Sequence, residues 1–444
     1  MNNNKNRLSL AIALGLLGSV TSTTSMAAGF QLAEYSATGL GRAYAGEAAM
    51  ADGADAQWRN MAMLTYLEGT QISVGGIYVD PNVDVNGYVD GSKSLTQKSG
   101  HTSSEDFAHS AVIPNFYLSH RVNEKLALGV ALGTNYGMET DLDENFAASH
   151  FGNTASIITK ELNLNIAYQV MPQLSIGGGV RYVMGEGHFG ATAPQNFTLN
   201  GIPIKKGTTL KYMEGTDEAL GWQVGTAWQI NETNRLGFTY KSEVKLDLEG
   251  HAEGVGFIPL SAMFPAQNLT KQGSMALIMP ATAELASFHQ LTDTVAIHAS
   301  VNWTDWSSFE KLEADFHDGK APTMVKEEHW EDNYRIALGG TYQLNQKITL
   351  RSGIAYDTSA VSDKNRTITI PETDRTWLSI GAGYEWSQNL SLDAGFTYII
   401  AKDAPITESR GYESDNEAQG IAGSFNGETT GSVWLLGVQA NYRF

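Results

Sequence analysis

The end of the chain alternates strictly between apolar residues and polar or small ones. Reading back from the last residue, the intervening positions are Arg443, Asn441, Gln439 and Gly437, and the apolar set is Phe444, Tyr442, Ala440, Val438, Leu436 and Trp434. A period of two places successive side chains on opposite faces of an extended chain. The pattern therefore predicts a β-strand with one apolar and one polar face.

The same alternation recurs along the chain and predicts fourteen strands. In 389–400 the apolar face holds Leu390, Leu392, Ala394, Phe396, Tyr398 and Ile400, and the other face holds Ser391, Asp393, Gly395 and Thr397. In 234–248 the alternation predicts one apolar and one charged face: Leu236, Phe238, Tyr240, Val244, Leu246 and Leu248 oppose Arg235, Lys241, Glu243, Lys245 and Asp247. Such charged faces predict a polar lumen or water on one side and lipid on the other. The segments are 69–80, 111–122, 125–136, 160–170, 173–185, 219–230, 234–248, 274–290, 293–316, 332–344, 347–357, 375–386, 389–400 and 431–444.

The connections between these segments alternate between tight turns and long loops. Tight turns follow one strand of each pair, and longer stretches near 81–110, 137–159, 186–218, 249–273, 317–331, 358–374 and 401–430 follow the other. This asymmetry is typical of a transmembrane barrel, and closing the last strand against the first removes exposed edges. The predicted fold is an all-β barrel of fourteen antiparallel strands. Tryptophans near the strand ends suit aromatic girdles, although any one of them could equally be a packing residue: Trp222, Trp228, Trp303, Trp377, Trp386 and Trp434.

Composition and the first residues narrow the setting further. Lys5 and Arg7 precede an apolar run over 8–20, and small residues end at Ala27, which predicts a signal peptide over 1–27 and a mature start at Ala28. A net charge of −19 argues against nucleic acid as a partner. The chain has no cysteine, so thiolate metal sites are excluded.

One stretch, residues 28–64, lacks any sustained period of two. Its backbone cannot lie unpaired in lipid, and its apolar residues, such as Phe30 and Leu40, argue against a disordered tail. A barrel of fourteen strands has an interior wide enough to hold it. The predicted organisation is a signal peptide over 1–27, an internal hatch over 28–66 and a barrel over 67–444.

The hatch sequence AGFQLAEYSATGLGRAYAGEAAMAD, together with DNYRIALGGTYQL, LRSGIAYDTS, NRTITIPETDRTWLSIGAGYEW and the last strand, resembles the FadL-type outer-membrane transporters of long-chain fatty acids and other hydrophobic compounds. The resemblance covers the whole mature chain in order. It implies a barrel occluded by an N-terminal hatch, passive uptake of a hydrophobic substrate, a monomer, and location in the outer membrane of a Gram-negative bacterium.

The resemblance also assigns ligand-binding residues. An inner site is implied around Ala28, Gly29 and Phe30, with Lys326 near the ligand carboxylate. A second basic residue of the family, on the fifth strand, has no counterpart where Glu186 stands, and only His188 lies nearby. An outer groove between the third and fourth long loops is implied at Phe197, Leu199, Ile202, Ile204, Val255, Phe257, Ile258, Leu260, Met263 and Phe264.

Two further motifs concern gating. The family's Asn-Pro-Ala sequence in the hatch stands here as Asn60, Met61 and Ala62, and the missing proline relaxes the local backbone restriction. The inward kink of the third strand, which opens a gap in the wall, corresponds to Asn135, Tyr136 and Gly137.

Other functions remain open alternatives. A lipid hydrolase would need an activated serine or a metal, and neither HExxH nor GxSxG occurs, so no catalytic residue, metal or cofactor is expected. A general porin would need no hatch, whereas aromatic hydrocarbons are carried by the same family. Outer-membrane lipid and lipopolysaccharide are expected to surround the barrel. The terminal aromatic resembles the signal by which such barrels are recognised by the barrel-assembly machinery.

Overall fold

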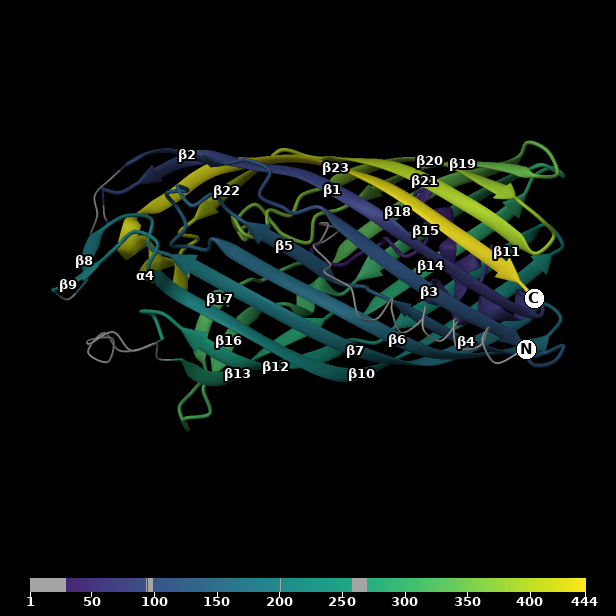
Figure 1. Cartoon of the computed structure of the whole chain (residues 1–444), viewed down its shortest axis with the longest axis horizontal. Coiled ribbons are helices and arrows are strands. Elements are labelled where there is room, and N and C mark those ends of the chain that lie inside the picture. The colour runs from purple at the N-terminus through teal and green to yellow at the C-terminus, as the bar shows by residue number, and fades with distance from the viewer. Residues whose placement is uncertain (1–28, 93, 95–98, 200, 258–269) are drawn as a thin grey trace, which may run out of the picture.

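The chain closes into a barrel of fourteen antiparallel strands, as the alternation predicted (Figure 1). The computed structural model describes residues 29–92, 94, 99–199, 201–257 and 270–444. The barrel closes where β1 (Thr70–Asp90) pairs with β23 (Ser424–Arg443) in an antiparallel ladder that joins Gln71 to Arg443 at one end and Asp90 to Ser424 at the other. The last strand therefore has neighbours on both sides, and the terminal aromatic strand is no free edge.

Each of the fourteen strand positions around the barrel is called a wall below, numbered in chain order from β1. Several walls consist of two shorter strands that follow one another in line. The remaining walls are, in chain order, β3 (Ala111–Arg121), β4 with β5 (Leu126–Gly133, Gly137–Asp141), β6 (Thr154–Met171), β7 (Leu174–Thr192), β10 (Thr209–Asn231), β11 with β12 (Asn234–Lys241, Val244–Glu253), β13 with β14 (Lys271–Met279, Thr282–Gln290), β15 with β16 (Val295–Thr304, Lys311–Asp315), β17 with β18 (Thr323–Glu327, Asn333–Gln343), β19 (Ile348–Asp357), β20 (Arg375–Glu385) and β21 with β22 (Leu390–Ala401, Ala404–Glu408).

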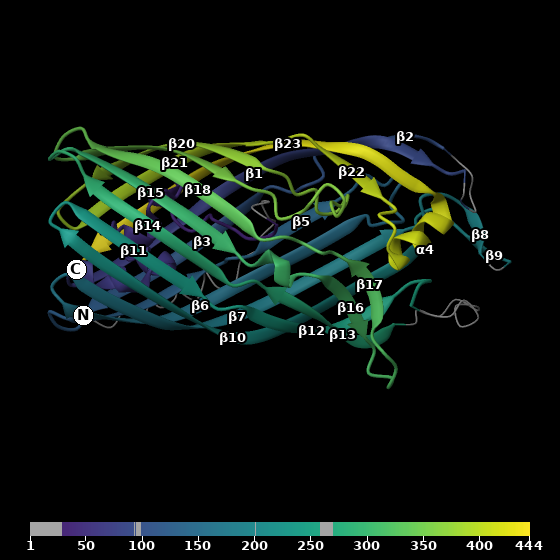
Figure 2. The ribbon, with the colours of Figure 1, turned by 180° about the vertical axis from the view of Figure 1, so that it is seen from behind.

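Tight turns gather at one end of the barrel and long loops at the other (Figure 2). The long-loop end carries β2 (Gly100–Ser104), the hairpin of β8 (Phe197–Leu199) and β9 (Ile202–Ile204), and the helix α4 (Glu413–Ala422). A short helical turn, η4 (Trp306–Ser308), joins β15 to β16. Among the described residues, no helix combines the length and the apolar character needed to cross a bilayer.

The apolar faces of most strands point outward and the polar faces point into the lumen. On β21, Leu392 and Phe396 are each 39% exposed, whereas Asp393 and Thr397 are 7% and 0% exposed. Because this is the reverse of a soluble protein, the outer face suits lipid. Trp222, Trp228 and Trp386 are likewise exposed on the outside.

Two expectations about side-chain direction are wrong. Trp377 is fully buried inside the barrel, so it is no girdle residue. The alternation over 234–248 also changes direction, because β11 ends before Ser242 and β12 begins only at Val244. Beyond this break the apolar side chains of Val244, Leu246 and Leu248 point inward, while Lys245 and Asp247 are exposed. Toward the long loops the outside of the wall meets water, so charges face outward and the apolar residues line the interior.

The N-terminal residues 29–67 fold inside the barrel as a hatch. It consists of α2 (Ala37–Leu40), η1 (Glu47–Ala49), α3 (Ala56–Arg59) and η2 (Met61–Tyr66), drawn in purple within the strands of Figure 1. These turns pack on strands all around the wall, from β6 and β7 to β20 and β21. The expected signal peptide and Ala28 lie outside the described residues.

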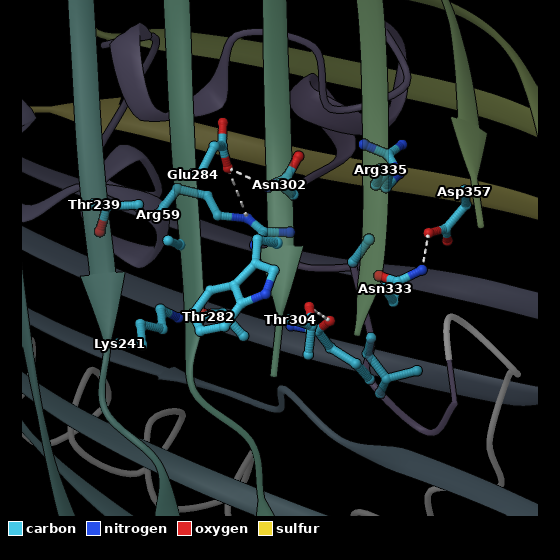
Figure 3. A pocket seen from close by; sticks show the side chains of 15 residues that line it. Arg59, Thr239, Lys241, Thr282, Glu284, Asn302, Thr304, Asn333, Arg335 and Asp357 are labelled. Atoms are coloured by element: carbon cyan, nitrogen blue, oxygen red, sulfur yellow. Dashed lines mark hydrogen bonds and ion pairs between the residues drawn. The ribbon is translucent and has the colours of Figure 1, made fainter. Parts of the chain in front are cut away.

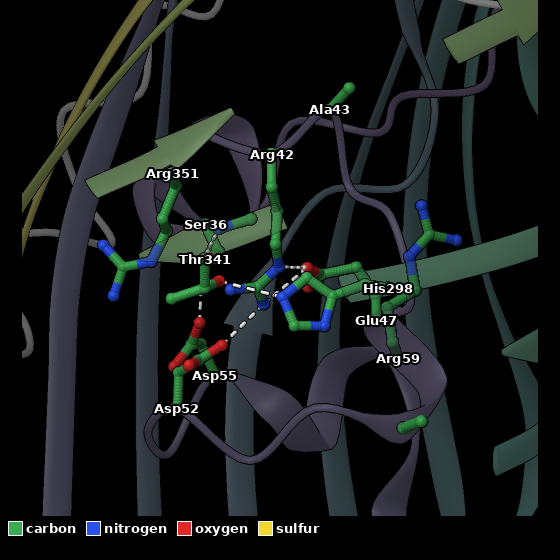
Figure 4. Close-up of polar contacts among 12 residues, drawn as sticks. Ser36, Arg42, Ala43, Glu47, Asp52, Asp55, Arg59, His298, Thr341 and Arg351 are labelled. Atoms are coloured by element: carbon green, nitrogen blue, oxygen red, sulfur yellow. Dashed lines mark hydrogen bonds and ion pairs between the residues drawn. The ribbon is translucent and has the colours of Figure 1, made fainter. Parts of the chain in front are cut away.

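A buried charged cluster holds the hatch together (Figure 4). Arg42, which is 1% exposed, pairs with Glu47 at 2.7 Å and with Asp52 at 2.5 Å. The hydroxyl of Ser36 caps α2 by accepting from Gly39 and donates to Asp55 at 2.7 Å. Such pairing offsets the cost of burying charge, and it fills the lumen with polar groups.

Candidate functional site

Phe30 lies at the centre of a group of aromatic rings. We call this group the Phe30 cluster: it consists of Phe30, Tyr136, Trp306, Phe309 and Trp330, all buried. The ring centroid of Phe30 lies 4.6 Å from that of Trp306 and 5.7 Å from those of Phe309 and Trp330. Aliphatic residues of the walls surround the cluster, among them Val183, Val244, Leu246, Leu248, Leu277 and Met279. The sequence inference placed Phe30 in a site but did not find these three partner rings, which come from η4 and the following loops.

Gly29 is fixed between two of these rings. Its φ is +62°, a conformation that favours glycine, and a Cβ atom there would lie 2.5 Å from Trp330 Cζ3 and 2.7 Å from Trp306 Cζ2. The residue before Phe30 therefore has no room for a side chain.

The bend of the third wall holds this end of the hatch. β4 ends at Gly133 and β5 begins at Gly137, and between them the chain turns in toward the hatch. The amide of Leu32 donates to the carbonyl of Asn135 at 2.7 Å, and the amide of Gly137 donates to the carbonyl of Phe30 at 2.8 Å. The hydroxyl of Tyr136 reaches across the lumen to the carbonyl of Pro280 at 2.8 Å. The kink residues inferred from sequence thus contact the predicted ligand-binding residue directly.

The wall is incomplete beside this bend. Residues 111–115 of β3 pair with β1, but the ladder between β3 and β4 begins only at Phe116 and Leu132. Farther along, an isolated bridge between Ala108 and Thr140 joins the two walls. Over the described residues, both polar side-chain atoms of the buried Asn115 lack a hydrogen-bond partner.

Lys326 is a buried cation beside the apolar interior. It is 5% exposed, and its Nζ lies 5.6 Å from the ring centroid of Phe189, which packs in the same apolar core as Phe30. In the part of the chain that the structure describes, this Nζ has no hydrogen-bond partner. Burial raises the pKa of the nearby Glu328 in the following loop, and the charge of Lys326 opposes that rise. The ammonium therefore has donors free for an anionic group.

The fifth wall carries a basic residue, Arg181, inside the lumen. Arg181 on β7 is 2% exposed and makes two bonds to Glu161, Nε to Oε1 at 2.8 Å and Nη2 to Oε2 at 2.9 Å. His188 instead faces outward, where its ring contacts Thr154 and Tyr212. The period of two explains this difference, because Arg181 shares its strand face with the inward Val183, whereas His188 lies on the opposite face.

The outer-groove residues divide between two clusters. Phe197 and Ile204 are buried in the β8–β9 hairpin, and Leu199, Ile202 and Val255 pack against them. Ile421 of α4 joins this cluster and was not anticipated. Phe257 belongs to the interior apolar core instead, with its ring 5.4 Å from that of Phe316. The predicted groove residues Ile258, Leu260, Met263 and Phe264 lie outside the described residues.

The hatch motif ties the plug to the wall. Asn60 caps η2 by accepting from the amide of Ala62 at 3.0 Å, and its Nδ2 donates to the carbonyls of Ala48 at 2.6 Å and Thr226 at 2.9 Å. Met61 takes the first position of η2, where a proline would also be tolerated. The short helix therefore forms without the family proline.

Comparison with known proteins agrees with this architecture. A family model described as outer membrane protein transport protein (OMPP1/FadL/TodX) matches residues 18–444. The chain belongs to this family. It is 35% identical to outer membrane protein P1 of Haemophilus influenzae, over 94% of the chain and 95% of that protein. It is 33% identical to the long-chain fatty acid transport protein of Escherichia coli, over 98% of each.

Solved structures of the OMPP1/FadL/TodX family share the fold. A Pseudomonas aeruginosa FadL homologue superposes with a TM-score of 0.81 at 23% identity, covering 94% of this chain and all of that one. The Ralstonia pickettii toluene transporter TbuX superposes with a TM-score of 0.62 at 18% identity, covering 89% and 95%.

Membership places the protein in the outer membrane of a Gram-negative bacterium. It is a FadL-family transporter of hydrophobic compounds, a group that includes carriers of fatty acids and of toluene-type hydrocarbons. Members of the family are transporters or channels.

Proposed function

We propose that this protein takes up long-chain fatty acids and that Lys326 binds their carboxylate. The observation that carries the proposal is the buried Nζ of Lys326, which has no partner among the described residues and lies beside the ring of Phe189. An apolar site with one free cation matches a ligand with a long tail and a single negative charge. A tail of about sixteen methylenes gains roughly 13 kcal/mol on leaving water, at about 0.8 kcal/mol per methylene. The relatives named as long-chain fatty acid transport proteins support the same substrate.

The route that we propose has three stages. The apolar outer loops, including Phe197 and Ile204, capture the ligand from outside. The ligand then enters the Phe30 cluster, with its carboxylate at Lys326. It leaves sideways through the wall where β3 and β4 part, beside Tyr136. Two observations support the lateral exit: the ladder is interrupted there, and the charged cluster around Arg42 fills the lumen below, where an alkyl tail would displace paired charges.

The hatch enters this scheme as the gate. We propose that removal of residues 1–27 leaves Ala28 as the first residue, directly before Gly29. The inner site would then consist of the mature N-terminus and Lys326. A ligand that displaces Phe30 would also break the bonds between Phe30 and Gly137 and between Leu32 and Asn135, which hold the bend of the third wall. Binding and opening of the wall would be coupled in this way.

Aromatic hydrocarbons are the second candidate substrate. The Phe30 cluster is built of rings in edge-on and tilted contact, an arrangement that accepts a further flat ring. A solved toluene transporter shares the fold. Such a ligand has no charge, so it would make no use of Lys326.

A competition binding assay on the refolded barrel tests the proposal. Oleate and p-xylene compete for the inner site of the wild-type protein and of Lys326→Ala, and tryptophan fluorescence reports binding through Trp306 and Trp330. We expect tight oleate binding that weakens at least about tenfold in Lys326→Ala, since a charge-assisted hydrogen bond contributes about 1.5–3 kcal/mol. Binding of p-xylene should not change. Equal losses for both ligands would refute the role of Lys326, and preference for p-xylene in the wild-type protein would favour the hydrocarbon.

A further inference from the structure

A cavity that contains several charged side chains lies between the hatch and the barrel strands (Figure 3). Its volume open to water-sized groups is about 30 Å³, and its lining begins with the three residues that follow Phe30, Gln31 to Ala33. The hatch helix α3 adds Arg59, and strands β11, β14, β15, β18 and β19 supply the rest of the lining. The small volume and the charged side chains of this lining suit a headgroup better than an alkyl tail.

Three cationic side chains line this cavity: Arg59, Lys241 and Arg335. Two carboxylates, Glu284 and Asp357, line it as well. The charges of the lining therefore do not balance, because the cations outnumber the carboxylates.

The two carboxylates are largely committed to other groups. Asp357 accepts from Asn333 at 3.0 Å and lies 3.8 Å from Arg375, which does not line the cavity. Glu284 accepts from the amide of Ala48 at 3.0 Å and from Asn302 at 2.8 Å, and only a 3.9 Å contact joins it to Arg59. Within the described ranges, neither Lys241 nor Arg335 forms a salt bridge with a carboxylate.

The third cation has an unused donor. Arg335 is 7% exposed; its Nη2 donates to the carbonyl of Ala43 at 2.8 Å, and its guanidinium lies 4.7 Å above the ring of Trp377. Its Nε has no hydrogen-bond partner anywhere in the described chain, and the same holds for Nε of Arg59. A buried donor without an acceptor is costly, so these groups favour an anion in the cavity.

The cavity also adjoins the bend of the third wall. Lys241 lines the cavity, and its Nζ donates to Oδ1 of Asn135 at 3.3 Å. Asn135 in turn holds Leu32, another lining residue, through its carbonyl. Two lining residues, Lys241 and Leu32, therefore contact the bend of the third wall, next to the hatch residue Phe30.

We propose that this cavity is a second carboxylate-binding site, in which Lys241, Arg335 and Arg59 hold the headgroup of the substrate after it leaves Lys326. The inference rests on the proposed function, since a neutral substrate would not use the site. In this site the cationic side chains would replace the hydrogen bonds to water that the carboxylate loses during passage. Without a second cationic site, the negative charge would cross the hatch region unpaired.

Matched ligands and variants test the inference. Radiolabelled palmitate and its uncharged analogue hexadecanol are supplied to Gram-negative cells whose only outer-membrane fatty-acid channel is this protein. Lys241→Met and Arg335→Met keep an apolar side chain of similar length and remove the positive charge. Lys241→Arg keeps the positive charge. Thr376→Val, a neutral change on β20 outside this lining, is the control. Palmitate affinity of the inner site is measured in parallel on the refolded proteins.

We expect palmitate uptake to fall at least about tenfold in Lys241→Met and in Arg335→Met, with hexadecanol uptake and inner-site affinity unchanged. Lys241→Arg and Thr376→Val should behave like the wild type. Unchanged palmitate uptake in both charge-removing variants would overturn the inference, and so would equal losses for palmitate and hexadecanol, which would mark a structural role. A wild-type protein that binds no palmitate would instead refute the proposed function itself.

Discussion

The ring of Phe30 meets the ring of Trp306 edge-on, with centroids 4.6 Å apart and planes at 75°. Edge-to-face contact of this kind adds to the free energy of burying the two rings. Phe30 belongs to the hatch and Trp306 to the connection between β15 and β16, so this pair joins the plug to the wall inside the proposed ligand site. A ligand that enters the Phe30 cluster must loosen this contact.

Gly29→Ala should damage the inner site by steric conflict. The added Cβ would lie 2.5 Å from Trp330 and 2.7 Å from Trp306, so the rings or the hatch must shift. We expect palmitate affinity to fall at least about tenfold, since overpacking costs about 1–3 kcal/mol. Gly319→Ala is the matched control, because its φ is also positive, +77°, and nothing lies within 4 Å of the new atom. Equal effects of both changes would point to backbone strain in place of the conflict with the rings.

Removing one partner of the pair between Arg181 and Glu161 should destabilise the barrel. Both side chains are buried and joined by two hydrogen bonds. Arg181→Met leaves a buried carboxylate unpaired, and we expect a loss of about 3–5 kcal/mol in the free energy of unfolding, measured by urea titration in detergent. The double variant Arg181→Met/Glu161→Gln should recover much of that loss. If the double variant were as unstable as the single one, the cost would lie in packing and not in the unpaired charge.

The outer loops should loosen below neutral pH through His150. Its Nε2 lies 2.8 Å from the carbonyl of Gly423 at the end of α4, and burial lowers the pKa of this histidine to about 4. The folded loop favours the neutral ring, so the stabilisation is complete above about pH 6.5 and is lost as the pH falls toward 4. The loss amounts to about 3 kcal/mol. Hydrogen exchange of α4 should therefore speed up between pH 6.5 and 4, and His150→Gln should remove most of that dependence.

Asn60→Ala should loosen the hatch from the wall without unfolding the barrel. The change removes the cap on η2 and the bonds to the carbonyls of Ala48 and Thr226. Loss of a cap costs about 1 kcal/mol, and the two unpaired buried carbonyls add to it. Single-channel recordings in planar bilayers should show more frequent openings than in the wild type. Asn426→Ala, an exposed change on β23, is the control, and similar openings in both variants would contradict the role of Asn60.

The lipid-facing architecture could be predicted because the alternation of a strand is local. The polar face that Asp393 and Thr397 share requires only that neighbouring residues point in opposite directions. The same alternation predicted the number of strands and the closure of the barrel by the last strand. Its absence over 28–64 predicted the position of the hatch. The resemblance added Phe30 and Lys326, and the structure places both beside one apolar core.

The sequence determined by itself that the strands would have two faces. Only the tertiary structure decided which face points into the lumen at each level along the barrel axis. The phase reverses after Ser242, because the wall passes from lipid into water and its apolar residues then line the interior. Arg181 in the lumen, Trp377 beneath Arg335 and the rings around Phe30 also depend on residues far apart in the chain. Their contacts arise from the stagger of the strands and the folding of the loops, which no local pattern records.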